Sequence, residues 1–257
     1  MDLIADHISH RFGTLDVLDD VSFTVSAGEV VAVVGPSGCG KSTLLSILGG
    51  LLQPSAGAAE LRGAPPAGSL NPLTFVFQDF ALLPWCTVEE NVEFPLRHSM
   101  ADAAERRAVV DDALRRTNLS DFRVAYPKQL SGGMRQRVGI ARALAVKPTI
   151  LLMDEPLSAL DSQTRELLME DFVRLLADGA MGAVYVTHNL EEAVRLADRI
   201  VVLSRRPGRV REVVTIPLTR TERGELQARE KLLALQGDLW ALIRTEAIDA
   251  EREVQHG

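Results

Sequence analysis

Hydrophobic and polar positions alternate in the first thirty residues and then give way to short apolar runs. In Val-Ser-Phe-Thr-Val at 21–25, an apolar residue recurs at every second position, which is the period of half-buried strands. A continuous apolar run at 29–34 is typical of a strand buried on both faces of a parallel sheet. Glycines interrupt the chain at 35–40, and good helix formers follow. This order of strand, glycine loop and helix predicts the start of an α/β unit.

Apolar runs and helical patterns alternate through most of the remaining chain. Strands are expected at 73–77, 150–153, 182–187 and 200–203, and helices at 103–117, 134–146, 162–177 and 190–197. Such alternation is expected of a doubly wound parallel sheet. Residues 85–147 are mainly helical in pattern and predict an insertion in this core, whereas 53–73 predict only short strands. Leucines at 232, 235, 239 and 242 predict a C-terminal helix, which either packs on its own domain or presents a face to a partner.

The composition is that of an ordinary globular protein, and it excludes several other classes. The 257 residues are 46% hydrophobic and 25% charged, which suffices for a full core. Cys39 and Cys86 are too few for a disulfide scaffold and lack the spacing of zinc ligands. The net charge of −7 argues against nucleic acid as the main partner. The sequence shows neither an apolar run of membrane-spanning length nor a secretory signal, so a cytoplasmic protein is expected.

The segment Gly35-Pro-Ser-Gly-Cys-Gly-Lys-Ser42 matches the phosphate-binding pattern G-x-x-x-x-G-K-[ST]. Its glycines let backbone N–H groups turn toward anionic oxygens, and the following helix directs the positive end of its dipole to the same point. Lys41 is expected at the β- and γ-phosphates and the Ser42 hydroxyl on Mg²⁺. Cys39 occupies a variable position, where a small filler is favoured over a redox sensor. We therefore predict a nucleotide site.

Two carboxylates, Asp154 and Glu155, follow the apolar run at 150–153. Ligands of open α/β sheets bind at this edge, where Asp154 fits a Mg²⁺ ligand, directly or through water. Glu155 is placed to orient or deprotonate an attacking water. The alternative, a pair of solvated acids, is weakened by the phosphate loop. The segment Ser131-Gly-Gly133 precedes a helical pattern and, on its residues alone, is either a helix N-cap or a second anion-binding nest.

Together these motifs resemble the ATP-binding subunit of ABC transporters over about residues 3–212. The motifs in order are the phosphate loop, Gln78, Leu130-Ser-Gly-Gly133, Asp154-Glu155-Pro156, Ser158-Ala-Leu-Asp161 and His188. The segments Gln78-Asp-Phe-Ala-Leu-Leu-Pro-Trp85 and Ser204-Arg-Arg-Pro-Gly-Arg-Val210, with Met134, are similar to the nitrate, sulfonate and taurine importer group.

The resemblance implies an α/β fold with a P-loop NTPase (RecA-like) core and a mainly parallel sheet. An N-terminal antiparallel β subdomain and an inserted helical subdomain complete it. The expected parts are the N-terminal core with the β subdomain at 1–84 and the helical subdomain with the signature motif at 85–147. The C-terminal core at 148–215 and a helical extension at 216–257 follow.

The resemblance also implies a role for each motif residue. The expected ATP-binding residues are Phe12, which stacks on adenine, and Gly35, Pro36, Ser37, Gly38, Cys39, Gly40, Lys41, Ser42 and Thr43. The expected catalytic residues are Glu155, His188, Lys41 and Gln78, and the expected Mg²⁺ ligands are Ser42, Gln78 and Asp154. Ser131, Gly132 and Gly133 would face the ATP of a second copy, and Asp161 would couple the two sites. Asn189 departs from the family pattern, in which Asp often follows the histidine.

The implied function is ATP hydrolysis that powers an importer for a small solute of the nitrate, sulfonate or taurine type. The implied partners are a second copy of the chain, two transmembrane permease subunits and, indirectly, an extracytoplasmic substrate-binding protein. The expected location is peripheral, on the cytoplasmic face of the inner membrane. The alternatives are an ABC ATPase of DNA repair or translation, an exporter cassette, and a binding module without catalysis. The sequence leaves open the solute, the permease, the role of the C-terminal helix and the redox sensitivity of Cys39.

Overall fold

The computed structural model describes residues 1–176 and 181–256 and divides by its contacts into two compact units. The first unit combines Met1–Ala64 with Val173–Gly257, and the second comprises Pro65–Phe172. Parallel strands alternate with helices, and an antiparallel sheet forms near the N-terminus, which confirms the predicted α/β class. The domain limits expected from the sequence stay a prediction.

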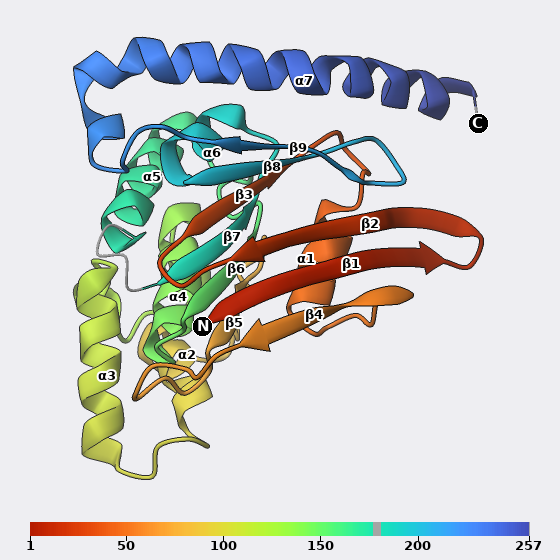
Figure 1. Cartoon of the computed structure of the whole chain (residues 1–257). Helices are drawn as coiled ribbons and strands as arrows, with labels where there is room; N and C mark the ends of the chain where they lie inside the picture. The colour runs from red at the N-terminus through yellow and green to blue at the C-terminus, as the bar shows by residue number, and fades with distance from the viewer. Residues whose placement is uncertain (177–180, 257) are drawn as a thin grey trace. The chain divides into compact units, whose positions relative to one another are not determined.

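An antiparallel sheet of three strands opens the first unit (Figure 1). Its strands are β1 (Asp2–Phe12), β2 (Leu15–Val25) and β4 (Ala56–Arg62), in the order β2-β1-β4. Alternate residues of β1, such as Leu3 and Ala5, are buried, as the period of two requires. The β4 strand contains alanines and a glycine in place of β-branched residues, so its hydrophobic pattern is weak, and pairing with β1 defines it.

Four further strands lie in the first unit, and one of them leads into the phosphate loop. They are β7 (Gly182–Val186), β3 (Val30–Val34), β8 (Arg199–Leu203) and β9 (Val210–Thr215), hydrogen-bonded in that order. The β3 strand pairs in parallel with β7 and β8, and all five of its residues are 0% exposed. The antiparallel edge strand β9 was not predicted, because Arg211 and Glu212 interrupt its valines and none of its residues is buried.

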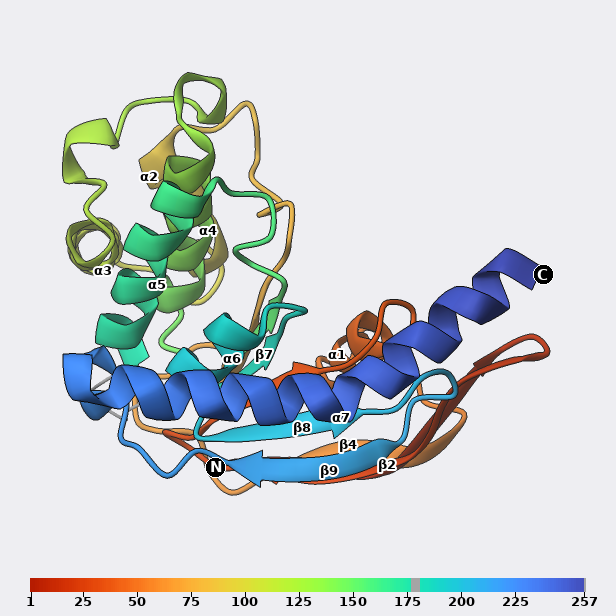
Figure 2. The ribbon, with the colours of Figure 1, turned by 90° about the horizontal axis from the view of Figure 1, so that it is seen from above.

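Two helices of the first unit contact these strands. The α1 helix (Lys41–Leu48) contacts β7, and α6 (Leu190–Leu196) contacts β3. Two short 3₁₀ turns, η4 (Glu222–Gly224) and η5 (Leu226–Ala228), lead into α7 (Arg229–His256), which runs past α6 (Figure 2). Leu232 and Leu239 are buried along α7, so this helix packs on its own unit. No helix within the described ranges is long and apolar enough to cross a membrane.

The second unit pairs two parallel strands with a group of helices. The strands are β5 (Leu73–Val76) and β6 (Ile150–Asp154). The helical elements are α2 (Val88–Glu93), η1 (Phe94–Leu96), α3 (Ala103–Arg116), η2 (Ser120–Phe122), η3 (Pro127–Gln129), α4 (Gly132–Ala145) and the start of α5 (Ser162–Leu176). Thr87 caps α2 with a complete capping box, and Asp102 caps α3. The core of the unit includes Val92, Leu114 and Val138, one from each of α2, α3 and α4.

Candidate functional site

The phosphate loop of the first unit joins β3 to α1. Gly38 and Gly40 have φ angles of 76° and 105°, a left-handed conformation that side chains with a Cβ rarely adopt. A Cβ added at Gly40 would lie 2.7 Å from Cδ2 of Leu18, so the position also lacks space for one. The loop therefore needs glycine at position 40, where the pattern places one, and α1 begins directly at Lys41.

Lys41 is the buried cation of this loop, with 8% of its surface exposed. Its ammonium donates hydrogen bonds to the carbonyl oxygens of Gly35, at 2.8 Å, and Pro36, at 3.0 Å. Loop carbonyls thus hold the side chain of Lys41 at the loop, where an anion would meet it. Ser42 is exposed at the start of α1, and Thr43 follows it.

Cys39 is a residue of the loop and is buried, with 1% of its surface exposed. Burial raises the pKa of its thiol, and the nearby Lys41 opposes this shift. A protonated buried thiol is a poor nucleophile, because the thiolate is the reactive form. Of the two interpretations of Cys39, burial therefore favours a small residue that fills space over a redox sensor.

His188 follows the carboxyl end of β7, beside the phosphate loop of β3. The two strands are parallel with Val33 opposite Val186, so their carboxyl ends meet at one edge of the sheet. The backbone N–H of Thr187 donates to the carbonyl of Val33 at 3.3 Å. His188 is exposed at this edge. The first unit thus brings the predicted histidine and the predicted phosphate loop together.

A buried hydrogen-bond network holds the backbone around His188. Glu192, 4% exposed, accepts from the hydroxyls of Tyr185 at 2.9 Å and Thr187 at 2.7 Å. Asn189 caps α6 by accepting from the N–H groups of Glu191 and Glu192. Asn at this position therefore performs the capping that Asp would also provide. Glu192 was not predicted from the sequence, because it lies beside Glu191 in the first turn of α6, where acids are common.

Phe12 ends β1 at the tip of the β1–β2 hairpin, opposite Leu15. Its side chain is 52% exposed. The ring of His10 lies edge-on to it, with centroids 4.5 Å apart and planes at 80°. An exposed aromatic ring supported from one side is suited to stack on a base.

The second unit gathers Gln78, Asp154 and Glu155 at one sheet edge. The β5 and β6 strands are parallel with Val76 opposite Met153, so the residues that follow them are neighbours. Asp154 and Glu155 are half-buried, and Gln78 is exposed. Glu155 has φ 43°, a left-handed conformation that is uncommon outside glycine and that recurs at functional sites.

Ser158 links the residues of this edge. The amide of Gln78 donates to the hydroxyl of Ser158 at 3.3 Å, and that hydroxyl donates to the backbone carbonyl of Glu155 at 2.9 Å. In the sequence, Ser158 stands out only as part of the motif at 158–161. Its side chain connects two predicted site residues that come from different strands.

The Ser-Gly-Gly segment forms the start of α4. Ser131 is exposed, and its hydroxyl accepts from the N–H of Met134 at 3.2 Å, so the serine is the N-cap of the helix. A Cβ at Gly133 would lie 2.5 Å from Cγ2 of Thr164 in α5, whereas the contact at Gly132 would be an ordinary 3.5 Å. The capping interpretation thus applies, and the exposed N-terminus of a 14-residue helix also suits an anion.

Asp161 precedes α5 and is exposed. Its carboxylate accepts from the N–H of Thr164 at 3.0 Å, and this hydrogen bond lowers the pKa of Asp161. The residue therefore acts as an ionised cap for the helix that packs on Gly133. Its role in coupling two sites stays a prediction.

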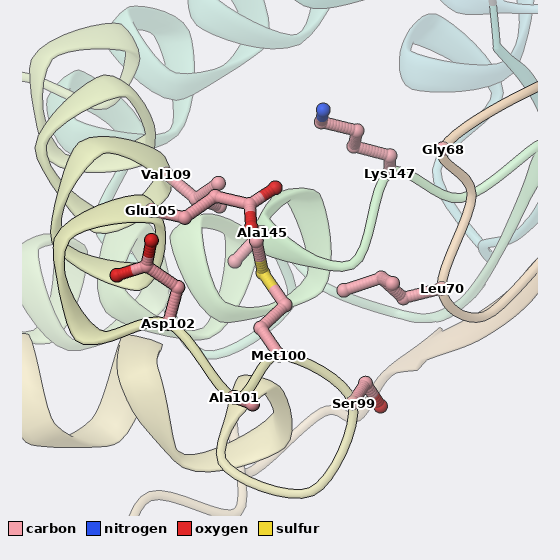
Figure 3. Close-up of a pocket in the computed structure, with 10 residues that line it drawn as sticks. All are labelled: Gly68, Leu70, Ser99, Met100, Ala101, Asp102, Glu105, Val109, Ala145 and Lys147. Carbon is pink, nitrogen blue, oxygen red and sulfur yellow. The ribbon is translucent and has the colours of Figure 1, made fainter.

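A separate pocket of about 410 Å³ lies in the second unit (Figure 3). Carboxylates of Asp102 and Glu105 flank it, together with Met100 and Lys147. None of the predicted site residues lines this pocket. Across the described residues, no group of three or more His, Cys, Asp or Glu side chains is arranged to hold a metal ion.

Comparison with known proteins agrees with this geometry. A family model for the ABC transporter matches residues 18–158. The chain is 48% identical over 200 residues to the taurine import ATP-binding protein of Burkholderia pseudomallei, covering 78% of this chain and 77% of that protein. It is 42% identical over 231 residues to the aliphatic sulfonates import ATP-binding protein of Xanthomonas axonopodis, covering 87% and 92%.

Solved structures of dimeric ABC cassettes are also similar to this chain. The dimeric structure of a bacterial ABC transporter cassette has a TM-score of 0.72 and 35% identity, over 84% of this chain and 99% of that one. A dimeric cassette in a post-hydrolysis state bound to ADP and Pi has the same TM-score and 33% identity. Because the family model spans more than half of the sequence and these relatives align over most of it, the chain belongs to the ABC transporter family.

Proposed function

We propose that the chain is the ATP-hydrolysing subunit of an importer for a small sulfonate-type solute. The similarity to taurine and aliphatic sulfonate import proteins supports the solute class. The link from Gln78 through Ser158 to Glu155 carries the proposal of hydrolysis, because it joins a polar sensor to the backbone of the residue that bears a carboxylate at the edge where ligands bind.

In this proposal the glycine loop holds the phosphates of ATP. Lys41 exchanges the carbonyls of Gly35 and Pro36 for phosphate oxygens, and Phe12 stacks on the adenine. Glu155 orients a water and takes its proton while the oxygen attacks the γ-phosphorus. The bond to the β-phosphate oxygen breaks, leaving ADP and phosphate. His188 and Gln78 contact the γ-phosphate end.

The proposed Mg²⁺ ligands are all oxygen donors, which fits this hard cation: the hydroxyl of Ser42, the amide oxygen of Gln78 and the carboxylate of Asp154. ATP phosphates supply further ligands, so few protein groups are needed. When bound, Mg²⁺ would neutralise charge on the phosphate oxygens.

Two copies of the chain complete the sites. Ser131, Gly132 and Gly133 lie at a helix start without a lysine, and only Ser131 among them is exposed, so they can complete a phosphate site but not build one alone. Dimeric relatives support this arrangement. We expect Asp161 to lie between the two copies.

The permease partner would meet exposed apolar side chains of the second unit. Trp85 is 72% exposed, and Phe94 is 50% exposed. Large exposed apolar groups mark interaction surfaces. We propose docking of two permease subunits here, on the cytoplasmic face of the cell membrane, with an extracytoplasmic binding protein delivering the solute.

Glu155→Gln tests the assignment of the base. The variant should bind ATP with wild-type affinity, lose nearly all hydrolysis and remain dimeric with ATP on gel filtration. Glu105→Gln, an exposed acid of the same unit, is the matched control and should hydrolyse ATP normally. Turnover at the wild-type rate by Glu155→Gln would show that the base lies elsewhere.

The solute class needs a second experiment. The chain is expressed with its tagged permease partner, identified by copurification from membranes, and the complex is reconstituted in vesicles with its binding protein. Uptake of taurine and an alkanesulfonate should depend on internal ATP. Uptake of nitrate alone would contradict the sulfonate assignment while leaving the ATPase assignment intact.

A further inference from the structure

The turn that follows Gln78 has a strained backbone. Phe80 and Ala81 have φ angles of 62° and 44°, which lie in the left-handed region. For residues with a Cβ this conformation is unfavourable and persists only where the surroundings enforce it. Two adjacent residues in this state, next to a proposed γ-phosphate sensor, require a group that holds them.

Arg142 of α4 is that group. Its Nη2 donates to the carbonyl of Phe80 and its Nη1 to the carbonyl of Ala81, both at 2.7 Å. Burial lowers the pKa of this guanidinium, and the charge of Asp79 opposes the shift. Asp79 also accepts from the N–H of Ala81 at 3.2 Å. A partly buried cation thus uses two charge-assisted hydrogen bonds on the two strained residues.

Gly139 brings the helix close enough for this contact. It lies three residues before Arg142 and therefore on the same face of α4. A Cβ added there would be 3.4 Å from Cβ of Phe80 and 3.7 Å from its carbonyl oxygen. Phe80 itself is buried, with 8% exposed. The turn is thus fixed to α4 by packing as well as by hydrogen bonds.

The same helix begins with the signature residues. The α4 helix runs from Gly132 to Ala145 without interruption, capped by Ser131. One rigid element therefore contacts the turn after Gln78 and carries the nest that would complete the partner's ATP site. Displacement of one end is transmitted to the other, because a hydrogen-bonded helix is stiff along its axis.

We propose that Arg142 is a positioning residue that locks the turn after Gln78 onto α4, so that the γ-phosphate sensor and residues 131–133 move as one body. This inference rests on the proposed function, in which Gln78 senses the chain's own ATP and residues 131–133 complete the partner's site. Each chain then couples the two ATP sites of the dimer, and hydrolysis is positively cooperative in ATP.

Arg142→Lys tests this coupling in the full-length homodimer. Lysine keeps the charge but lacks the planar fork that reaches two carbonyls. The wild type should show a Hill coefficient above 1 and not above 2, the number of sites. In Arg142→Lys it should fall to about 1, and kcat should drop about tenfold or more, since misplaced groups lose rate. The ATP Kd of the monomer should not change.

Matched variants separate coupling from general stability. Arg106→Lys is the control, because Arg106 of α3 also donates to two adjacent carbonyls, those of Met100 and Ala101, and should keep wild-type cooperativity. Ala81→Gly added to Arg142→Lys should restore part of the cooperativity, since glycine holds the left-handed turn without the clamp. Gly139→Val, whose methyl groups extend past the ordinary contact that a Cβ alone would make with Phe80, should lose cooperativity if Arg142→Lys does not fold.

Three results overturn the proposal. The first is a wild-type Hill coefficient of 1, and the second is wild-type cooperativity in both Arg142→Lys and Gly139→Val. The third is a loss of monomer ATP binding in Arg142→Lys that matches its loss of kcat, which would make Arg142 a nucleotide-site residue. Absence of ATP hydrolysis in the wild type would instead contradict the proposed function.

Discussion

Gln78 and Ser158 lie 80 positions apart in the chain and are joined by a hydrogen bond of 3.3 Å. The hydroxyl of Ser158 continues to the carbonyl of Glu155 at 2.9 Å. Because Glu155 has a left-handed backbone, its orientation depends on such local contacts. Ser158, which has no catalytic role in the proposed reaction, thus connects the proposed sensor with the backbone of the proposed base.

Ser158→Ala should therefore impair turnover rather than binding. The change removes both hydrogen bonds, and we expect kcat to fall by about 10- to 100-fold, since small misplacements of reacting groups have effects of this size. The KM for ATP should stay nearly constant, because Lys41 and the loop glycines are untouched. Steady-state ATPase kinetics measure both values. Ser99→Ala, at an exposed serine of the same unit, is the control. A kcat equal to that of the control would remove Ser158 from the site.

Much of the fold was predictable because burial imposes a simple pattern. The apolar run at 29–34 became β3, and the helical pattern at 103–117 became α3 with nearly the same limits. The β9 strand was not predicted, since two adjacent charged residues interrupt its valines at a sheet edge. An edge strand is defined by its partner, here β8, and not by a local apolar run.

The candidate site was predictable where a motif is contiguous and not where it depends on tertiary contacts. The glycine loop and the pair Asp154 and Glu155 stand out locally. Arg142 contacts carbonyls 61 and 62 positions away, and Ser158 contacts an amide 80 positions away. No periodicity or spacing within one segment indicates such partners, so they emerge only from the folded chain.

Phe12→Ala should weaken binding of ATP but not of inorganic tripolyphosphate. Stacking of a base on an aromatic ring contributes about 1–3 kcal/mol by alanine substitution, so the Kd for ATP should rise about 5- to 150-fold. Tripolyphosphate lacks the base and should bind equally well to both proteins in calorimetry. Leu15→Ala, at the exposed residue opposite Phe12, is the control. An equal loss of affinity for ATP and for tripolyphosphate would mean that Phe12 supports the phosphate loop and does not stack on the adenine.

Cys39 should react with thiol reagents more slowly than Cys86. Burial raises the pKa of the Cys39 thiol, so at any given pH a smaller fraction is the reactive thiolate, whereas Cys86 is only half-buried. Iodoacetamide at pH 8 followed by mass spectrometry of the peptides should find Cys86 modified first. In guanidinium chloride the two rates should converge. Labelling of Cys39 as fast as Cys86 in the folded protein would restore the redox-sensor interpretation.

Two glycine-to-alanine substitutions should change stability in opposite directions. A Cβ at Gly208 would lie 2.2 Å from the carbonyl oxygen of Cys39, so Gly208→Ala must displace the phosphate loop or its own loop. We expect a loss of about 1–3 kcal/mol in the free energy of unfolding, as for other overpacked sites, together with weaker ATP binding.

Gly237 in α7 is the opposite case, because a Cβ there meets no heavy atom within 4 Å. Gly237→Ala should raise the free energy of unfolding by about 0.5–1 kcal/mol, since alanine favours a helix interior over glycine. It should leave the ATP Kd unchanged. Urea unfolding and ATP titration of both variants measure these differences. If Gly208→Ala were as stable as Gly237→Ala and bound ATP normally, the close packing of the 204–209 loop on Cys39 would have no part in shaping the phosphate site.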